Sequence, residues 1–328
     1  MVLFAGAGLS AQAGLPSWRS LLKDVVDETV ANAMQSDEAR AELERMLVDG
    51  KLLQIADHCK DKLGPGGYTQ LLTERLADAD REVPEVHRLA MKLPFAAWVT
   101  TNYDKLLERA YAQERRGLQK TLTNRDTEAL GRLLFDGAPF ILKAHGDLDK
   151  PDSLVFTSRD YRDLIHGNAA FSAAFSAILM THSVLFAGYS LSDPDFNLLM
   201  DRQLLTFRGF APERFALMCG IGKVEEEYLW RVCQIRVIPY PDGEHAYVPR
   251  FFQALADRVA AEPGRVPPAP AVTSAPRSAA IAPSPVFGLE EEPEVPVATP
   301  AAPPIPAAFT LTLGWKDGAV YALSLIHI

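Results

Sequence analysis

The hydrophobic residues of the chain form short continuous runs that alternate with helical patterns. Val2–Ala5 is the first run, and five more follow from Phe95 onward. These later runs are Phe95–Thr100, Phe140–Ala144, Ser183–Ala187, Phe215–Cys219 and Ile235–Ile238. Helical spacing of apolar residues occurs at Tyr103–Ala112, Phe171–Met180, Asp195–Leu205, Val224–Val232 and Pro249–Ala260. This alternation predicts an α/β, Rossmann-like fold with a mostly parallel sheet and helices on both faces.

The segment between the first two apolar runs has a different pattern. Residues from about 16 to 93 contain few strand signals, and apolar residues recur at helical spacing, as in Trp18, Leu21, Leu22 and Val25. We therefore predict a helical module inserted after the first strand.

Proline divides the chain. More than half of its 24 prolines fall between Pro263 and Pro306, where alanine, serine and valine fill the gaps. Such a composition cannot bury a core, so residues 262–307 are predicted to be a disordered linker. Residues 1–261 are long enough for one complete α/β domain.

The residues beyond the linker are too few for a domain. Apolar residues alternate from Phe309 to Leu323, which predicts that 308–322 is the truncated start of a second, β-containing domain. Residues 323–328 resemble the translation of a transposon library adapter, and we interpret them as an artefact, with a natural strand as the alternative. The sequence is therefore expected to be a fragment, and whether its amino end is complete is left open.

Charge and cysteine content narrow the classes of function. The chain has 33 Lys+Arg against 42 Asp+Glu, a net charge of −9, so nucleic acid is not indicated as a partner. Its 3 cysteines form no CxxC pair, which argues against a disulfide framework and a cysteine zinc site and favours the cytoplasm. Asn168–Ser192 is uncharged over about 25 residues, but it divides into a helix and a strand and is interpreted as core, with no membrane association.

Polar segments directly follow four of the predicted strands. They are Gly6-Ala7-Gly8-Leu9-Ser10, Thr101-Asn102-Tyr103-Asp104, His145-Gly146-Asp147 and Gly188-Tyr189-Ser190. Each has an ordinary structural explanation: a turn glycine, a helix cap at Asn102, a surface charge at Asp104, a buried core histidine at His145. Ligands of parallel α/β sheets bind beyond the carboxyl ends of the strands, so together these segments predict one site at that edge.

In this order and spacing, the four segments resemble the motifs of the sirtuin NAD-binding domain, over roughly residues 1–260. They are most similar to the bacterial antiphage-defence branch, in which the second motif reads TTNYD, the third HGD and the fourth GYSxxDPD. The chain departs from sirtuin deacylases in having no cysteine between Gly146 and Thr181, where those enzymes carry a zinc module. The resemblance therefore implies NAD as the substrate and no zinc or other metal.

The resemblance also implies residue roles. Gly6, Ala7, Gly8, Ser10 and Arg19 would hold the phosphates and the nicotinamide ribose. Asn102, beside Thr101, would orient the ribose and the attacking water, and Asp104 would hold the nicotinamide side. His145 would act as the base, a role suited to imidazole near neutral pH. Gly188 and Ser190 would bind the adenosine side; Asp147 would either tune His145 or cap the next element, and Asp193 and Asp195 would shape the loop.

These roles predict a NAD hydrolase that releases nicotinamide and ADP-ribose in bacterial defence or stress. Two alternatives stay open: a NAD-dependent protein deacylase, and a non-catalytic module that senses NAD or ADP-ribose. The acceptor is also open between water, a cyclising hydroxyl and a protein. A homo-oligomer and a trigger acting through the missing carboxyl-terminal domain are further expectations.

Overall fold

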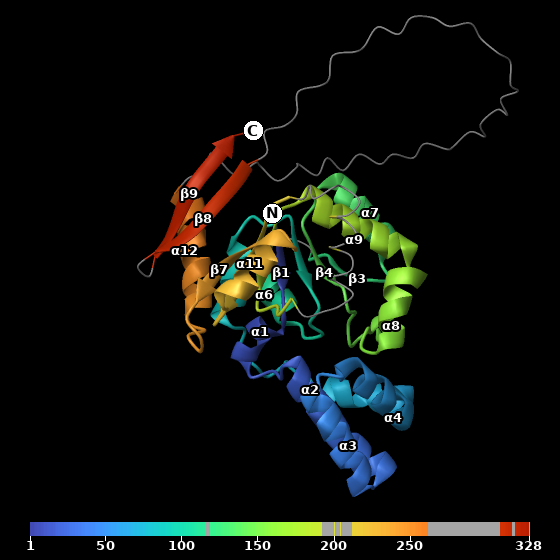
Figure 1. The fold of residues 1–328 in the computed structure, drawn as a ribbon. Coiled ribbons are helices and arrows are strands. Elements are labelled where there is room, and N and C mark those ends of the chain that lie inside the picture. The colour runs from blue at the N-terminus through green and yellow to red at the C-terminus, as the bar shows by residue number, and fades with distance from the viewer. Residues whose placement is uncertain are drawn as a thin grey trace, which may run out of the picture.

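The computed structural model describes residues 1–115, 119–191, 200, 204 and 212–261, together with the backbone at 309–316 and 319–327. Its main body is a parallel sheet in the order β3-β4-β2-β1-β5-β6-β7 (Figure 1). The strands are β1 (Val2–Ala5), β2 (Ala97–Thr100), β3 (Thr121–Thr123), β4 (Phe140–Lys143), β5 (Val184–Ala187), β6 (Arg214–Cys219) and β7 (Ile235–Tyr240). The predicted Rossmann-like α/β fold is confirmed.

Helices cover both faces of this sheet. They are α6 (Leu106–Glu114), α7 (Thr127–Asp136), α8 (Ser158–Arg162), α9 (Ala169–Thr181), α11 (Lys223–Arg231) and α12 (Tyr247–Ala261), with a π-helical turn η4 (Asp163–Gly167) and a 3-10 turn η3 (Pro151–Ser153). The helix predicted at Asp195–Leu205 falls outside the continuously described residues. Residues 168–192 begin with α9 and β5, as predicted.

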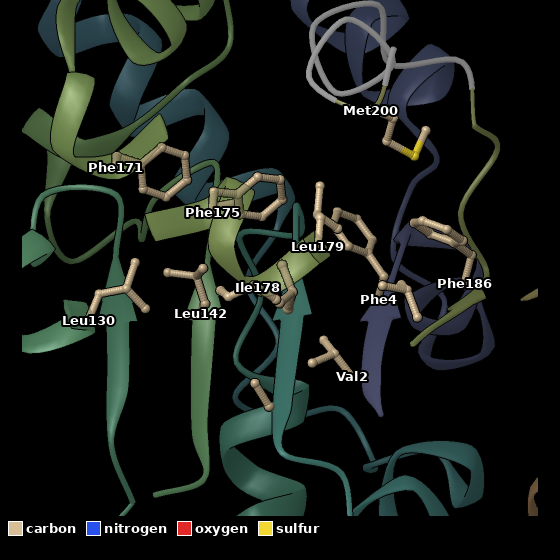
Figure 2. Packing of buried hydrophobic residues seen from close by; sticks show 14 of the residues in the cluster. Val2, Phe4, Leu130, Leu142, Phe171, Phe175, Ile178, Leu179, Phe186 and Met200 are labelled. Carbon is tan, nitrogen blue, oxygen red and sulfur yellow. The ribbon is translucent and has the colours of Figure 1, made fainter. Parts of the chain in front are cut away.

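Alternation along the strands sends neighbouring side chains to opposite faces of the sheet. Val2 and Phe4 of β1 pack under α9, where Phe171, Phe175, Ile178 and Leu179 point toward the strands (Figure 2). Leu3 and Ala5 face the opposite layer, which contains α5 (Glu85–Lys92), α6 and α12. Because both faces of the central strands are buried, these strands are apolar at nearly every position.

The helical insertion after the first strand is also confirmed. It contains α1 (Ala7–Ser10), η1 (Ala11–Ala13), α2 (Trp18–Thr29), η2 (Val30–Met34), α3 (Asp37–Val48), α4 (Leu52–Arg75) and α5. Helices α2, α3 and α4 share a core of their own, whereas α5 packs on the sheet. The lobe formed by α2, α3 and α4 lies beyond the end of the sheet at which α1 begins (Figure 1).

Local sequence explains the helix boundaries in this lobe. The Ser17 hydroxyl caps α2 by accepting from the Ser20 N–H at 3.2 Å, and Ser36 caps α3 in the same way. Helix α4 is broken at Gly64, whose φ of 70° is followed by Pro65. In this lobe α2 and α3 are therefore capped by their own serines, and all three helices pack around one apolar core.

Two segments differ from the sequence interpretation. The sequence does not predict strand β3, because Thr121-Leu122-Thr123 is short and contains one apolar residue. In the structure β3 pairs with β4 and forms one edge of the sheet. At the other end of the chain, β8 (Phe309–Lys316) pairs antiparallel with β9 (Ala319–His327), so β9 includes most of the six residues interpreted as an artefact. The origin of residues 323–328 stays a prediction, and the linker predicted at 262–307 falls outside the described residues.

Among the described residues, no single helix is long and apolar enough to cross a membrane. The segments Ser158–Gly167 and Ala169–Thr181 reach that length and apolar content only when taken together across an 80° bend.

Candidate active site at the carboxyl edge of the sheet

The carboxyl ends of four adjacent strands lie in one row of the sheet. Lys143 pairs with Thr100, Thr100 pairs with Ala5, and Ala5 pairs with Ala187. The four polar segments found in the sequence begin within two residues of this row. Parallel pairing in register therefore brings them to a common level at one edge.

The first and fourth segments touch through their glycines. Gly6 N–H donates to the Ala187 carbonyl at 2.9 Å, and Gly8 N–H donates to the Gly188 carbonyl at 2.8 Å. A Cβ on Gly6 would lie 2.3 Å from the Gly188 oxygen, and one on Gly188, whose φ is +62°, would lie 2.4 Å from the Leu9 nitrogen. These glycines thus allow the two backbone segments to meet. The N–H groups of Gly6 and Gly8, two of the residues expected to hold the phosphates, donate instead to β5 and to the turn after it.

A hydrogen-bonded chain joins the first and second segments. Asn102 Nδ2 donates to Ser10 Oγ at 2.9 Å, and the Ser10 hydroxyl hydrogen-bonds to the Asp104 side chain. An ionised carboxylate only accepts, so the hydroxyl donates to Asp104 and receives from Asn102. This order fixes the Asn102 amide, with the amino group toward Ser10 and Oδ1 on the other side.

Asp104 is not a surface charge, because it is only 7% exposed. Its Oδ1 accepts from the Leu106 N–H at 3.1 Å, at the start of α6. Burial raises the pKa of the Asp104 carboxyl, while the hydrogen bonds from Ser10 and Leu106 and the charge of Lys143 act in the opposite direction. The side chain is therefore an internal anchor for Ser10 and for the loop after β2.

The third segment turns sharply after β4. Gly146 has a φ of +92°, and a Cβ there would lie 2.2 Å from the Ser153 oxygen, so the turn requires glycine. His145 is 8% exposed and meets the ring of Tyr161 edge-on, with 5.1 Å between centroids. The imidazole is thus positioned by packing on α8.

Asp147 stabilises this turn. Its carboxylate accepts from Lys143 Nζ at 2.9 Å and from the Asp149 N–H at 2.9 Å. Burial would raise the pKa of the Asp147 carboxyl, but the ion pair and hydrogen bonds with Lys143 hold it below its usual value. These contacts lie within the turn, and whether Asp147 tunes His145 or caps the next element stays a prediction.

The remaining predicted site residues are not part of this hydrogen-bonded chain. Arg19 is exposed in α2, where its guanidinium donates to the Leu47 carbonyl of the helical lobe. Thr101 and Ala7 are half-buried, and Ser190 is exposed just after β5. Asp193 and Asp195 lie outside the described residues. The predicted binding roles of all of these residues stay predictions.

Sequence reasoning gave no role to two buried charged residues beside the site. Lys143 of β4 and Glu108 of α6 lie outside the four polar segments, and their side chains lie 3.1 Å apart. The available signal was the lysine itself, since a charged residue in an otherwise apolar strand needs a buried partner. Over the described part of the chain, no group of three or more His, Cys, Asp or Glu side chains is arranged to hold a metal ion.

A parallel α/β sheet with a glycine turn after its first strand is typical of dinucleotide-binding α/β domains. Residues 96–238 match a family model described as SIR2-like domain. The matched stretch includes Asn102, Asp104, His145 and Gly188.

The chain is also similar to several longer curated proteins. The chain is 29% identical over 200 residues to a protein named NAD(+) hydrolase ThsA from Cytobacillus dafuensis, covering 61% of this chain and 37% of that protein. It is 26% identical over 224 residues to a protein of the same name from Acinetobacter baumannii (strain 532279), covering 68% and 43%. A protein named Defense-associated sirtuin 2 from Bacillus subtilis is 24% identical over 204 residues, covering 61% and 19%. The chain spans less than half the length of each of these relatives.

Proposed function

We propose that the chain is a NAD hydrolase that cleaves the bond between nicotinamide and ribose, acting in bacterial defence. The observation that carries the proposal is that two polar residues, Asn102 and His145, lie at the same height along the carboxyl edge of the sheet. Asn102 and His145 each lie two residues beyond a paired position of adjacent strands, Thr100 and Lys143. Three relatives of the same kind, all named NAD(+) hydrolase, support the choice of substrate and reaction.

The reaction needs a polar group at the ribose and a base for water. The bond between the anomeric carbon and the nicotinamide nitrogen breaks, and nicotinamide leaves with the electron pair as the ring carbon gains oxocarbenium character. Water then forms the new carbon–oxygen bond and loses a proton. Asn102 Oδ1, on the side of the amide away from Ser10, would accept a hydrogen bond from a ribose hydroxyl or the water. His145 would take the proton.

Ser10 and Asp104 would act through Asn102. If the hydroxyl of Ser10 were absent, the Asn102 amide would be able to flip, and the donor in place of the acceptor would meet the ribose. The glycine contact between Gly8 and Gly188 would hold the two phosphate-side segments together. Arg19, Thr101 and Ser190 keep their proposed roles in binding NAD.

The direct test is incubation of the purified protein with NAD, with nicotinamide and ADP-ribose separated by chromatography. His145→Ala should lower the rate by about 10²–10⁴-fold, the usual contribution of a positioned acid–base group. Asn102→Ala should lower it by about 10²–10³-fold, as for the loss of one polar group that stabilises the transition state. Gln253→Ala, which removes an exposed amide on α12, is the matched control and should keep the rate. Undiminished nicotinamide release by both site variants would refute the proposal.

The same assay distinguishes the alternative functions. Nicotinamide release that requires an acyl-lysine peptide would identify a deacylase, and calorimetric binding of NAD without product would identify a sensing module. The cytoplasmic location, a homo-oligomer and a trigger in a further domain are part of the proposal. An open reading frame that continues past Leu323 in an independent assembly would identify that domain.

A further inference from the structure

Lys143 is a fully buried lysine at the last position of β4. Its side chain has 0% exposure. Its Nζ lies 3.0 Å from the carbonyl oxygens of Tyr103 and Asp104, 2.9 Å from Asp147 Oδ2 and 3.1 Å from Glu108 Oε1. An ammonium group has three hydrogens, so these four acceptors occupy all of its donors.

Three of these four acceptors belong to the two segments that carry the proposed catalytic side chains; the fourth, Glu108, lies in α6. Tyr103 and Asp104 directly follow Asn102, and Asp147 lies two residues after His145. One ammonium group therefore connects the loop after β2 to the turn after β4. Backbone bonding between β2 and β4 extends one residue past the paired row, from the Ala144 N–H to the Thr100 carbonyl at 2.8 Å, and beyond it the Lys143 side chain connects the two segments.

Charge balance alone does not account for this arrangement. Three buried carboxyl groups, on Asp104, Glu108 and Asp147, surround one lysine, and Glu108 Oε2 is buried without a hydrogen-bond partner. A buried ammonium group needs an acceptor for each of its three hydrogens, and the choice of acceptors decides which segments it connects. Here two of its four contacts are carbonyl groups of the Asn102 loop, which fixes the backbone of that loop directly.

We propose that Lys143 is the positioning residue that sets the Asn102 loop and the His145 turn at the distance required for cleavage of NAD. The proposal rests on the proposed function. Lys143 does not touch the substrate. It acts through the backbone at Tyr103 and Asp104 on one side and through the Asp147 carboxylate on the other.

The test compares Lys143→Met with a second lysine that forms an ion pair in the same protein. Methionine keeps most of the apolar stem and removes all donors. Lys92→Met is the control, because Lys92 of α5 pairs with Glu114 at the end of α6 at 3.6 Å, away from the Asn102 loop and the His145 turn. Near-attack geometry is sensitive to shifts of about 1 Å, so Lys143→Met should lower kcat about 10²-fold, with a smaller change in KM. Lys92→Met should keep kcat.

A double variant separates positioning from stability. Lys143→Met leaves buried carboxylates unpaired and will lower the stability of the fold. Adding Glu108→Gln removes one of these charges and should recover part of the stability, measured by urea unfolding, while kcat stays low. Recovery of kcat together with stability would show that Lys143 has only a structural role and would overturn the inference. If the single variant does not fold, the double variant is compared with wild type directly.

Failure of the two proposals can be told apart. A wild-type protein that cleaves NAD while Lys143→Met retains its kcat would refute the positioning role alone. A wild-type protein that never cleaves NAD, with or without an acyl peptide, would refute the proposed function and this inference with it.

Discussion

An added methyl group at Gly6 should damage the protein through packing alone. Its backbone is extended, with φ of −107° and ψ of 178°, so alanine brings no conformational strain there. The added Cβ would instead lie 2.3 Å from the Gly188 oxygen and 2.6 Å from the Tyr189 Cα. Both neighbours are backbone atoms, which no rotamer change can move aside. Overpacking ordinarily costs about 1–3 kcal/mol, and this contact belongs at the upper end, near 3 kcal/mol.

The measurement is thermal unfolding followed by circular dichroism, with two glycine controls. A loss of about 3 kcal/mol should lower Tm by roughly 6–12 °C in a domain of this size. Gly8→Ala should lower Tm less, because its nearest contact is 2.9 Å, from Gly188 Cα. Gly131→Ala lies in α7 with nothing within 4 Å of the new Cβ, and it should raise stability by about 0.4–1 kcal/mol. A Gly6→Ala protein with the wild-type Tm would refute the packing argument.

Two further predictions concern the helices around the site. Phe156→Ala should lower the free energy of urea unfolding by about 3–5 kcal/mol, because Phe156 is 1% exposed and its ring centroid lies 4.2 Å from that of Trp18. Phe135 is 93% exposed, so Phe135→Ala should change this free energy by less than about 0.5 kcal/mol. Equal effects of the two variants would contradict this assignment of the core. Burial lowers the pKa of His87 to about 4. As the pH falls from about 6.5 to about 4, the imidazole is therefore protonated in the unfolded state but not in the folded state. The free energy of unfolding should fall by about 3 kcal/mol over this range. His87→Leu should flatten the dependence of urea unfolding on pH in this range, and an unchanged slope would exclude His87 as its source.

The sheet was predictable because its central strands are apolar at nearly every position. The bounds of Val2–Ala5 follow from the sequence, since Gly6 directly follows this apolar run. The edge strand β3 was not, because one buried leucine between two threonines carries no period that distinguishes a strand from a loop. Its pairing with β4 is a tertiary contact, and short edge strands depend on such contacts more than on their own sequence.

The position of the site in the fold could be predicted from the sequence, but only some of its contacts could. Parallel strands that end in register bring their following residues together, so segments at Gly6, Asn102, His145 and Gly188 had to meet. The sequence could not show that the N–H groups of Gly6 and Gly8 would donate hydrogen bonds to β5 and the turn after it. Nor could it show that Arg19 would donate to the Leu47 carbonyl in the helical lobe. These partners come from chain segments whose approach is set by packing, which spacing along the chain does not encode.

The buried lysine was the strongest signal that sequence reasoning did not use. Taking an ammonium group out of water costs several kcal/mol unless a carboxylate compensates, so Lys143 at the end of a strand of four fully buried residues requires acids nearby. Two are recognisable by spacing: Asp147 four residues later across the turn, and Glu108 in the first turn of the helix after the neighbouring strand. Both flank the Asn102 loop. A charged residue at the end of an apolar strand therefore predicts that residues of opposite charge lie nearby. Here those residues lie next to the loop after β2 and in the turn after β4, which the proposed chemistry needs to hold together.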